Sequence, residues 1–278
     1  MKEHIIKSDG NLETFNEDKI ISSLTKSGAT PEQARDVLDY LKPEIREGAS
    51  TEDIHNLAIQ HLSKVEHKLV LRYSLKRAIM SMGPQGFVFE KYIAKILDNY
   101  GYTTEVGQIL KGCCVNHEVD VVAKKDTMVF FIESKYHNHR GIYSDVKTAL
   151  YIHARFVDIK KAIKKKKDSN NIHYYGWLVT NTKATSEAIK YATCVKLRIL
   201  AWQYPKEKNL QYYIEKKKLY PISILTTITK NQKEALFDSG ILLVQELVSM
   251  GDDEIMRLLS IKKIKTMKIL NEIEILLG

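Results

Sequence analysis

The sequence predicts an α/β chain, α+β overall: a mainly helical region with a β-hairpin, a central mixed sheet flanked by helices, and a small all-helical region. Two short apolar runs flank Asp9-Gly10, which is a strong hairpin signal. Strand-like and helix-like segments alternate in the middle of the chain, and apolar residues recur at helical spacings near its end. We therefore expect three domains, over residues 1–83, 85–218 and 222–278.

The first region has a clear order of helix starts. Good N-cap and first-turn residues stand at Asn16, at Thr30-Pro31, and at Ser50 or Thr51. A fourth helix is expected over about residues 66–81. The cluster Gly83-Pro84-Gln85-Gly86 is typical of a linker and ends the region.

The central region alternates helices and strands. The expected elements are a helix over residues 87–100, strands over 119–123 and 128–132, a helix from Ser144 to about Lys167, a strand over 173–180, a helix over 185–193 and a strand over 196–202. Phe87, Tyr92, Ile96 and Leu97 are available for one face of the first helix. This order is typical of a layered α/β domain.

Composition narrows the classes of function. The chain has 278 residues, of which 44% are hydrophobic and 28% charged, as in ordinary folded proteins. Its net charge of +9 favours a polyanionic partner. No apolar run approaches the roughly 20 residues of a membrane helix, and no signal peptide or P-loop is visible. The three cysteines form no disulfide or zinc pattern, so we expect a cytoplasmic protein.

Charged side chains interrupt the two apolar strands of the central hairpin. Glu118 and Asp120 share a face of the first strand, and Glu133 and Lys135 share a face of the second. Such groups are costly to bury unless they bind something. Three carboxylates can hold Mg²⁺ or Mn²⁺, and Lys135 can orient or deprotonate a water molecule bound there. The alternative is a structural ion cluster in which Lys135 pairs with Glu133 or Asp120.

These residues belong to two short motifs, His117-Glu118-Val119-Asp120-Val121 and Ile132-Glu133-Ser134-Lys135-Tyr136. Over about residues 85–203 the chain resembles the Mrr-like restriction endonucleases of the PD-(D/E)xK superfamily. The resemblance implies that Asp120, Glu133 and Lys135 are catalytic, that Asp120 and Glu133 bind the metal, and that Glu90 is an extra metal contact. Glu118 is either a further metal ligand or an exposed carboxylate at the end of its strand. Family members often have a Gln in the following helix, where this chain offers Lys147, Tyr151 and Arg155.

The N-terminal region contains groups suited to a nucleotide. Lys7 and Lys19 can converge on a phosphate chain, with Asn16 at a helix start that favours anions. Thr51 and His55 lie one turn apart and can contact a purine or ribose. The alternative is a helical domain with two solvated lysines.

The same region resembles an ATP-cone over residues 3–80, through Ile6-Lys7-Ser8-Asp9-Gly10, Phe15-Asn16-Glu17-Asp18-Lys19-Ile20 and Thr51-Glu52-Asp53-Ile54-His55. By position, the residues that match nucleotide contacts of that family are Lys7, Glu13, Asn16, Lys19, Thr51 and His55. The resemblance implies ATP or dATP as a regulatory ligand. Ser8 stands where the family usually has Arg, which removes one phosphate-binding charge.

Two further segments are basic. Lys160, Lys161 and Lys164–Lys167 end the long helix, either as a solvated terminus or as phosphate contacts. The tail resembles a degenerate helix-hairpin-helix module, but Thr229-Lys230-Asn231 and Ser260-Ile261-Lys262 replace its glycine turns. Lys230, Lys262, Lys263 and Lys265 can contact phosphate, or the tail binds protein.

Together these observations favour a Mg²⁺-dependent endodeoxyribonuclease of restriction or defence type, regulated by ATP or dATP. We expect DNA and an adenine nucleotide as partners, a homo-oligomer, and no membrane. A junction- or repair-specific nuclease is the nearest alternative within the enzyme class. In another class stands a non-catalytic, nucleotide-responsive DNA-binding regulator.

Overall fold

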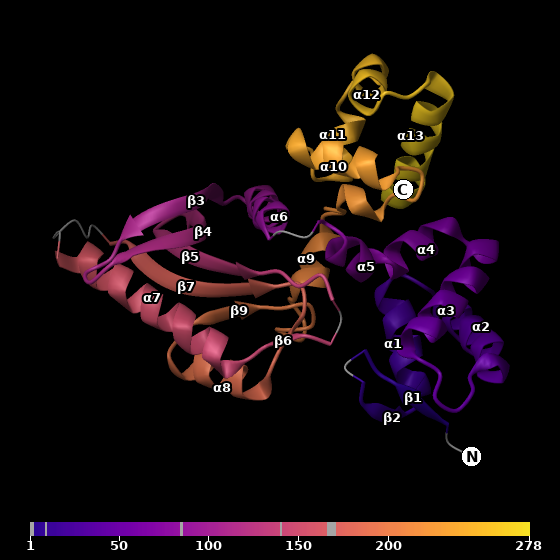
Figure 1. Cartoon of the computed structure of the whole chain (residues 1–278), viewed down its shortest axis with the longest axis horizontal. Coiled ribbons are helices and arrows are strands. Elements are labelled where there is room, and N and C mark those ends of the chain that lie inside the picture. The colour runs from indigo at the N-terminus through magenta and orange to yellow at the C-terminus, as the bar shows by residue number, and fades with distance from the viewer. Residues whose placement is uncertain (1–2, 9, 84–85, 140, 166–170) are drawn as a thin grey trace. The chain divides into compact units, whose positions relative to one another are not determined.

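The computed structural model describes residues 3–8, 10–83, 86–139, 141–165 and 171–278. It confirms the mixed α/β class (Figure 1). The chain forms two compact units. Unit 1 comprises residues 1–78, 222–235 and 247–278, and unit 2 comprises residues 79–221 and 236–246. Among the helices in the described part of the chain, none is long and apolar enough to cross a membrane.

The N-terminal part of unit 1 is a β-hairpin followed by helices. The elements are β1 (His4–Ile6), β2 (Leu12–Thr14), α1 (Glu17–Lys26), α2 (Pro31–Leu41), the 3₁₀ turn η1 (Lys42–Glu44), α3 (Thr51–Val65), α4 (His67–Tyr73) and α5 (Leu75–Met80), which ends in unit 2. The expected N-caps Asn16, Thr30 and Ser50 are confirmed, each accepting a backbone N–H three residues on. The prediction of a single helix over residues 66–81 is wrong, because the helix is interrupted at Ser74, between α4 and α5.

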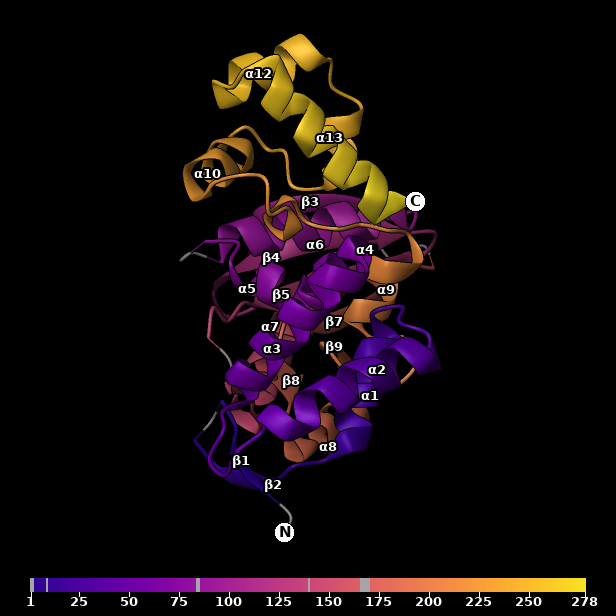
Figure 2. The same cartoon turned by 90° about the vertical axis from the view of Figure 1, so that its right-hand side faces the viewer.

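The hairpin expected at Asp9-Gly10 is also confirmed. Strands β1 and β2 pair antiparallel, with His4 opposite Thr14, and Gly10 has a φ of +81°, which favours glycine. Asp9 itself lies outside the described residues. The hairpin reaches the start of α3, where the N–H of Ile6 donates to the carbonyl of Ala49 at 2.9 Å (Figure 2).

The C-terminal part of the chain is helical, as expected. Its elements are the 3₁₀ turn η2 (Ile222–Ile224), α10 (Lys230–Asp238), α11 (Val244–Val248), α12 (Asp252–Leu259) and α13 (Lys263–Leu277). Within unit 1, α13 packs against α4. The turn between α12 and α13 contains Ser260, which has a φ of +52°. Ser260 belongs to one of the two turns in which this chain lacks the glycines of the helix-hairpin-helix module.

Unit 2 is built on a five-stranded sheet with the order β3-β4-β5-β7-β9. Its strands are β3 (Thr103–Lys111), β4 (Asn116–Lys125), β5 (Met128–Lys135), β7 (His173–Thr180) and β9 (Arg198–Leu200), and β6 (Tyr143–Ser144) pairs with β8 (Lys183–Ala184) in a small separate sheet. Strands β3, β4 and β5 are antiparallel, whereas β5, β7 and β9 are parallel. The helices are α6 (Phe87–Asn99), α7 (Val146–Lys165), α8 (Ser186–Cys194) and α9 (Leu210–Lys216).

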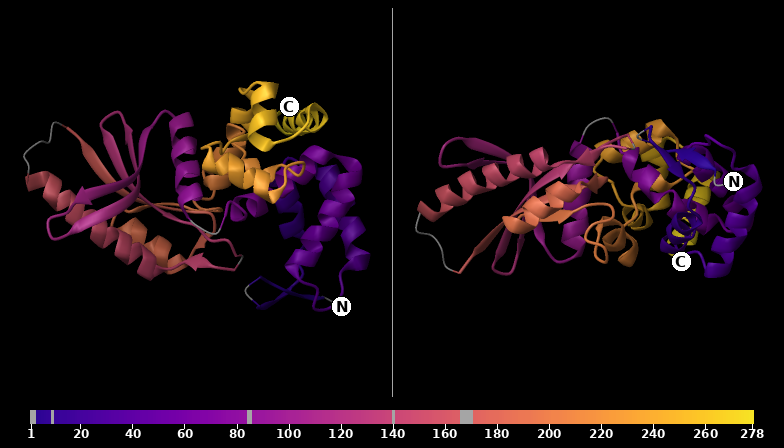
Figure 3. Two further views of the ribbon diagram at one scale, coloured as in Figure 1. Left: turned by 45° about the horizontal axis from the view of Figure 1, so that its top comes forward. Right: turned by 90° about the horizontal axis from the view of Figure 1, so that it is seen from below.

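Helix α7 runs along the sheet (Figure 3). Phe156 and Ile159 of this helix pack with Val122 and Phe131 of the strands in one buried cluster. The helix begins one residue later than expected: Asp145, and not Ser144, accepts the N–H of Thr148 at 2.9 Å. Of the basic run that ends the helix, Lys166 and Lys167 lie outside the described residues.

Helix α6 packs against β3, β4 and β5, and its residues Phe89, Tyr92, Ile96 and Leu97 are buried. The expectation that Phe87 shares this buried face is wrong. Its side chain is exposed at the first position of the helix, with the ammonium of Lys91 over its ring. The buried face therefore begins at Phe89, two residues further into the helix than the sequence pattern indicates.

Candidate active site and nucleotide site

Asp120 lies where β4 and β5 separate. The paired ladder between the two strands ends at Val121 opposite Ile132. Beyond this point, the N–H of Ser134 donates to Oδ2 of Asp120 at 2.6 Å instead of bonding to the neighbouring backbone. The carboxylate is thus fixed beside the end of β5, which carries Glu133 and Lys135.

The regular alternation of β4 is interrupted at Asp120. Val119 and Val122 are three residues apart, yet both pack in the cluster with Phe156. A period of two would place them on opposite faces, so the side chains of β4 change face between Val119 and Val122. On β3, Gly107 occupies the position opposite Asp120 in the register and has a φ of +65°. Glycine adopts this conformation without strain.

Glu133 is buried and paired through both carboxylate oxygens. Its side chain is 10% exposed. Lys135 Nζ donates to Oε1 at 2.6 Å, and Arg155 Nη1 of α7 donates to Oε2. The structure therefore brings Glu133 and Lys135 together, as the sequence predicts, and adds a second cation that the sequence did not place.

The carboxylates near the end of β5 interact with one another electrostatically. Burial, together with the charges of Asp120, Glu118 and Glu133 and against that of Lys135, raises the pKa of Glu90 to about 7. Burial likewise raises the pKa of Asp120 to about 6, with Glu133 adding to the effect and the Ser134 N–H opposing it. Glu118 is exposed, at the outer edge of this group. Negative charge is thus in excess where two β-strands diverge.

This donor set fits a hard divalent cation. Asp120 and Glu133 supply carboxylate oxygens, and the Ser134 carbonyl lies in the chain beside them. Burial is the main cause of the raised pKa values of Glu90 and Asp120, and a bound cation would relieve the repulsion between carboxylates that adds to it. No three His, Cys, Asp or Glu side chains in the described ranges form a complete ligand group, so a cation would need the backbone or water as further ligands.

A polar network beside Lys135 was not anticipated from the sequence. The N–H of His137 donates to Oδ1 of Asn181 at 2.9 Å, and Nδ2 of Asn181 donates to the carbonyl of His137 at 2.8 Å. Burial lowers the pKa of His137, with Lys135 adding to the effect. Asn181 directly follows β7, which pairs parallel to β5. Because ligands often bind where parallel strands end, a prediction of this parallel pairing would have pointed to Asn181.

In the N-terminal region, Lys7 and Lys19 converge, but on Glu13. Lys19 Nζ donates to Oε1 of Glu13, and Lys7 Nζ lies 3.7 Å from Oε2. The hydrogen bond from Lys19 lowers the pKa of Glu13, with the charges of both lysines adding to it. Asn16 uses its side-chain oxygen to cap α1, accepting the Lys19 N–H at 3.2 Å. Lys7, Glu13 and Lys19 therefore form one charged group on a half-exposed surface, at the helix start that Asn16 caps.

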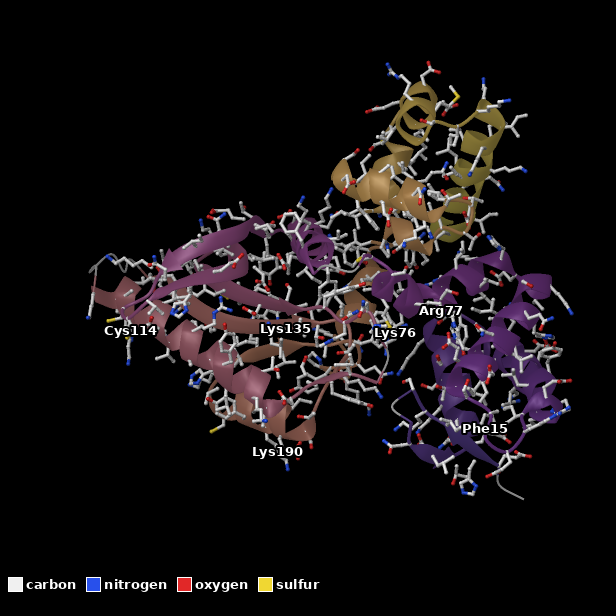
Figure 4. All side chains as sticks on the ribbon, viewed as in Figure 1. Phe15, Lys76, Arg77, Cys114, Lys135 and Lys190 are labelled. Carbon is white, nitrogen blue, oxygen red and sulfur yellow. The ribbon has the colours of Figure 1, made fainter. Side chains whose placement is uncertain are left out.

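Thr51 and His55 lie on the first turns of α3, next to the hairpin that carries Lys7. The ring of His55 stacks on Tyr73 of α4 at a centroid distance of 4.6 Å. Arg77, labelled in Figure 4, donates to Glu52 at 3.2 Å and to Asn56 at 3.0 Å. Tyr73 and Arg77 were not among the expected site residues, because only the packing of α4 and α5 on α3 brings them there.

Comparison with known proteins identifies families for two regions of the chain. The ATP cone domain family matches residues 3–81, and the family described as AF1548-like, C-terminal, matches residues 220–277. The chain is 36% identical over 174 residues to an uncharacterized protein of Archaeoglobus fulgidus, covering 62% of this chain and 92% of that protein. It is also similar to the crystal structure of a protein of unknown function, AF1548, with a TM-score of 0.57, 32% identity, and coverage of 68% of this chain and 97% of that one.

The chain joins an ATP cone to a mixed α/β region and a helical C-terminal region, and the cone match indicates regulation by a nucleotide. The chain belongs to the AF1548-like family. The family matches cover the cone and the C-terminal region. The nuclease motif between them therefore stays a prediction.

Proposed function

We propose that this protein is a Mg²⁺-dependent endodeoxyribonuclease of restriction or defence type, controlled by ATP or dATP bound to its cone. One observation carries the proposal: Asp120, Glu133 and Lys135 meet where β4 and β5 diverge, with excess negative charge around them. The resemblance to the PD-(D/E)xK superfamily assigns catalytic roles to the same three residues. The net charge of +9 is consistent with a DNA substrate.

Each residue of the site has a defined role in this proposal. Asp120, Glu133 and the Ser134 carbonyl hold the cation, with Glu90 and Glu118 beside them as further carboxylates. The bound cation supplies charge neutralisation at the phosphodiester and activation of a water molecule. Lys135 orients the attacking water or stabilises charge that develops on the phosphate. Two strands of DNA require two such sites, so we expect a homo-oligomer.

The cone regulates this activity in the proposal. Glu13 holds Lys7 and Lys19 at one point, and the phosphates of ATP or dATP can replace the carboxylate as their partner. Thr51 and His55 then face the base or ribose. Binding changes activity only if the nucleotide favours one state of the protein over another.

A second candidate is a nucleotide-responsive DNA-binding regulator without catalysis. The observation that favours it is the double ion pair of Glu133, whose oxygens both have cationic partners, Lys135 and Arg155. In that case the cluster is structural. A buried carboxylate held by two cations satisfies its charge without any metal.

One assay distinguishes the two candidate functions. Plasmid DNA, modified and unmodified, and branched DNA are incubated with the full chain in Mg²⁺ or in EDTA, with and without ATP or dATP. Cleavage only in Mg²⁺ supports the nuclease, and its dependence on nucleotide gives the sign of regulation. DNA binding that responds to nucleotide, with no cleavage of any substrate, supports the regulator.

A further inference from the structure

The two cations that pair with Glu133 differ in their surroundings. The side chain of Lys135 is 36% exposed, whereas that of Arg155 is 15% exposed. Lys135 is the last residue of β5, the central strand of the sheet. An ammonium in this position keeps much of its hydration and can exchange partners at low cost. The side chain of Arg155 is better shielded from water.

Several contacts fix Arg155. The ring of Tyr151, one turn earlier on α7, lies 5.2 Å from the guanidinium carbon. A cavity of about 20 Å³ lies against the Glu133–Arg155 pair, lined otherwise by apolar side chains such as Phe131 and Phe156. This space has room for about one water molecule. The ion pair is therefore poorly hydrated on this side, where its electrostatic attraction is stronger than at the surface.

We propose that Arg155 is a positioning residue that keeps Oε2 of Glu133 when a divalent cation binds, so that Oε1 alone is offered to the cation. Lys135 is then the partner that leaves Glu133, and its ammonium becomes free to act on the substrate. This inference rests on the proposed nuclease function, because it assigns to Arg155 a role in forming that metal site.

Loss of Arg155 has two opposite consequences. A positive charge near the incoming cation disappears, so the cation binds more tightly. At the same time Glu133 can rotate and offer both oxygens, which misplaces the cation relative to Asp120 and Lys135. Small errors of position in an active site cost about hundredfold in rate. Tighter binding together with slower catalysis separates this role from simple structural support.

The experiment measures Mn²⁺ binding by isothermal titration calorimetry and DNA cleavage by the full chain and its variants. Arg155→Gln is expected to bind Mn²⁺ about tenfold more tightly, with kcat about hundredfold lower and KM unchanged. Arg155→Lys keeps the charge but not the planar guanidinium, so its Mn²⁺ affinity stays near that of the wild type while kcat falls. Lys190→Gln, at an exposed position of α8 and labelled in Figure 4, is the matched control and changes neither value.

Thermal unfolding of each variant shows whether it is folded. If Arg155→Gln does not fold, the kcat and the Mn²⁺ affinity of Arg155→Lys test the inference instead. The inference is wrong if the wild type binds Mn²⁺ and Arg155→Gln binds it with the same affinity, or if Arg155→Lys has the kcat of the wild type. Either result leaves the nuclease proposal standing. A wild type that binds no Mn²⁺ contradicts the proposed metal site itself, and the role of Arg155 falls with it.

Discussion

Oε1 of Glu272 in α13 lies 3.5 Å from Nε2 of His67, the first residue of α4. Unit 1 therefore brings a residue of the AF1548-like C-terminal region against a residue of the ATP cone. Glu272 is 3% exposed, and its carboxylate also accepts the backbone N–H and the hydroxyl of both Thr226 and Thr227. A single buried charge thus organises this junction.

Removing that charge is expected to destabilise the fold. Burial by itself raises the pKa of Glu272, but the hydrogen bonds from Thr226 and Thr227 outweigh burial and lower it. The folded carboxylate therefore stabilises the protein above its unfolded pKa of about 4.3, and this contribution is lost as the pH falls through the lower folded value. Glu272→Gln should lower the free energy of unfolding by about 2 kcal/mol at pH 7.

Urea denaturation at pH 7 and at pH 3 measures this effect. The difference between wild type and Glu272→Gln should shrink at the lower pH. Glu274→Gln, exposed on the same helix, is the matched control and should match the wild type at both values. Equal stability of Glu272→Gln and Glu274→Gln at pH 7 would show that the hydrogen bonds to Glu272 contribute little.

Glu90 is expected to make the stability of the protein depend on pH in the opposite direction. Its pKa is raised to about 7 by burial and by neighbouring carboxylates, so the folded state binds its proton more tightly than the unfolded state does. Stability in EDTA should therefore fall as the pH rises from about 5 to about 8. Glu90→Gln removes the buried charge and should be more stable than the wild type by about 1 kcal/mol at pH 8.

At pH 5 the same variant should show no such gain, because Glu90 of the wild type is then protonated. Chemical denaturation at the two pH values, with the exposed Glu207→Gln as control, is the measurement. A gain of equal size at both values contradicts the assignment of the effect to ionised Glu90.

A divalent cation should stabilise the wild type through Asp120. At millimolar Mn²⁺, the Tm should rise by about 3 °C, since a ligand that binds only the folded state stabilises it. Asp120→Asn, which removes one charged ligand, should abolish the rise and should itself be at least as stable as the wild type in EDTA. Differential scanning calorimetry with and without EDTA tests this, and an identical rise in both proteins places the cation elsewhere.

The cone should bind adenine nucleotide through Lys19. Lys19→Gln removes a phosphate partner and should weaken ATP binding by about tenfold. Lys26→Gln lies on the same helix, is exposed in the last turn, and should bind ATP as the wild type does. Fluorescence titration with a labelled ATP analogue measures both, and equal losses in the two variants indicate a non-specific charge effect.

Local patterns predicted much of this structure. The β4–β5 hairpin follows from alternating apolar residues and a polar turn, and the first three N-caps follow from single residues. Strand β3 was missed because it is an edge strand in which exposed and half-buried residues alternate and none is buried. Its sequence therefore lacks the apolar signal on which strand prediction depends.

Contacts that depend on tertiary packing were not predictable. Arg155 and Glu133 are 22 residues apart and meet only because α7 lies on the sheet. The contact between His67 and Glu272 requires α4 and α13 to pack in one unit. In both cases the sequence identifies a charged residue on a helix, but not the partner that the fold places beside it.

The most direct measurement is the Mg²⁺-dependent conversion of supercoiled plasmid by the wild type and by Asp120→Asn, prepared in parallel. Conversion by the wild type in Mg²⁺ and not in EDTA, with none by the folded variant, is the result that the proposed nuclease predicts. Equal conversion by both proteins would mean that Asp120 is not part of the active site. No conversion of plasmid or branched DNA by the wild type, with nucleotide bound, would contradict the nuclease and favour the regulator.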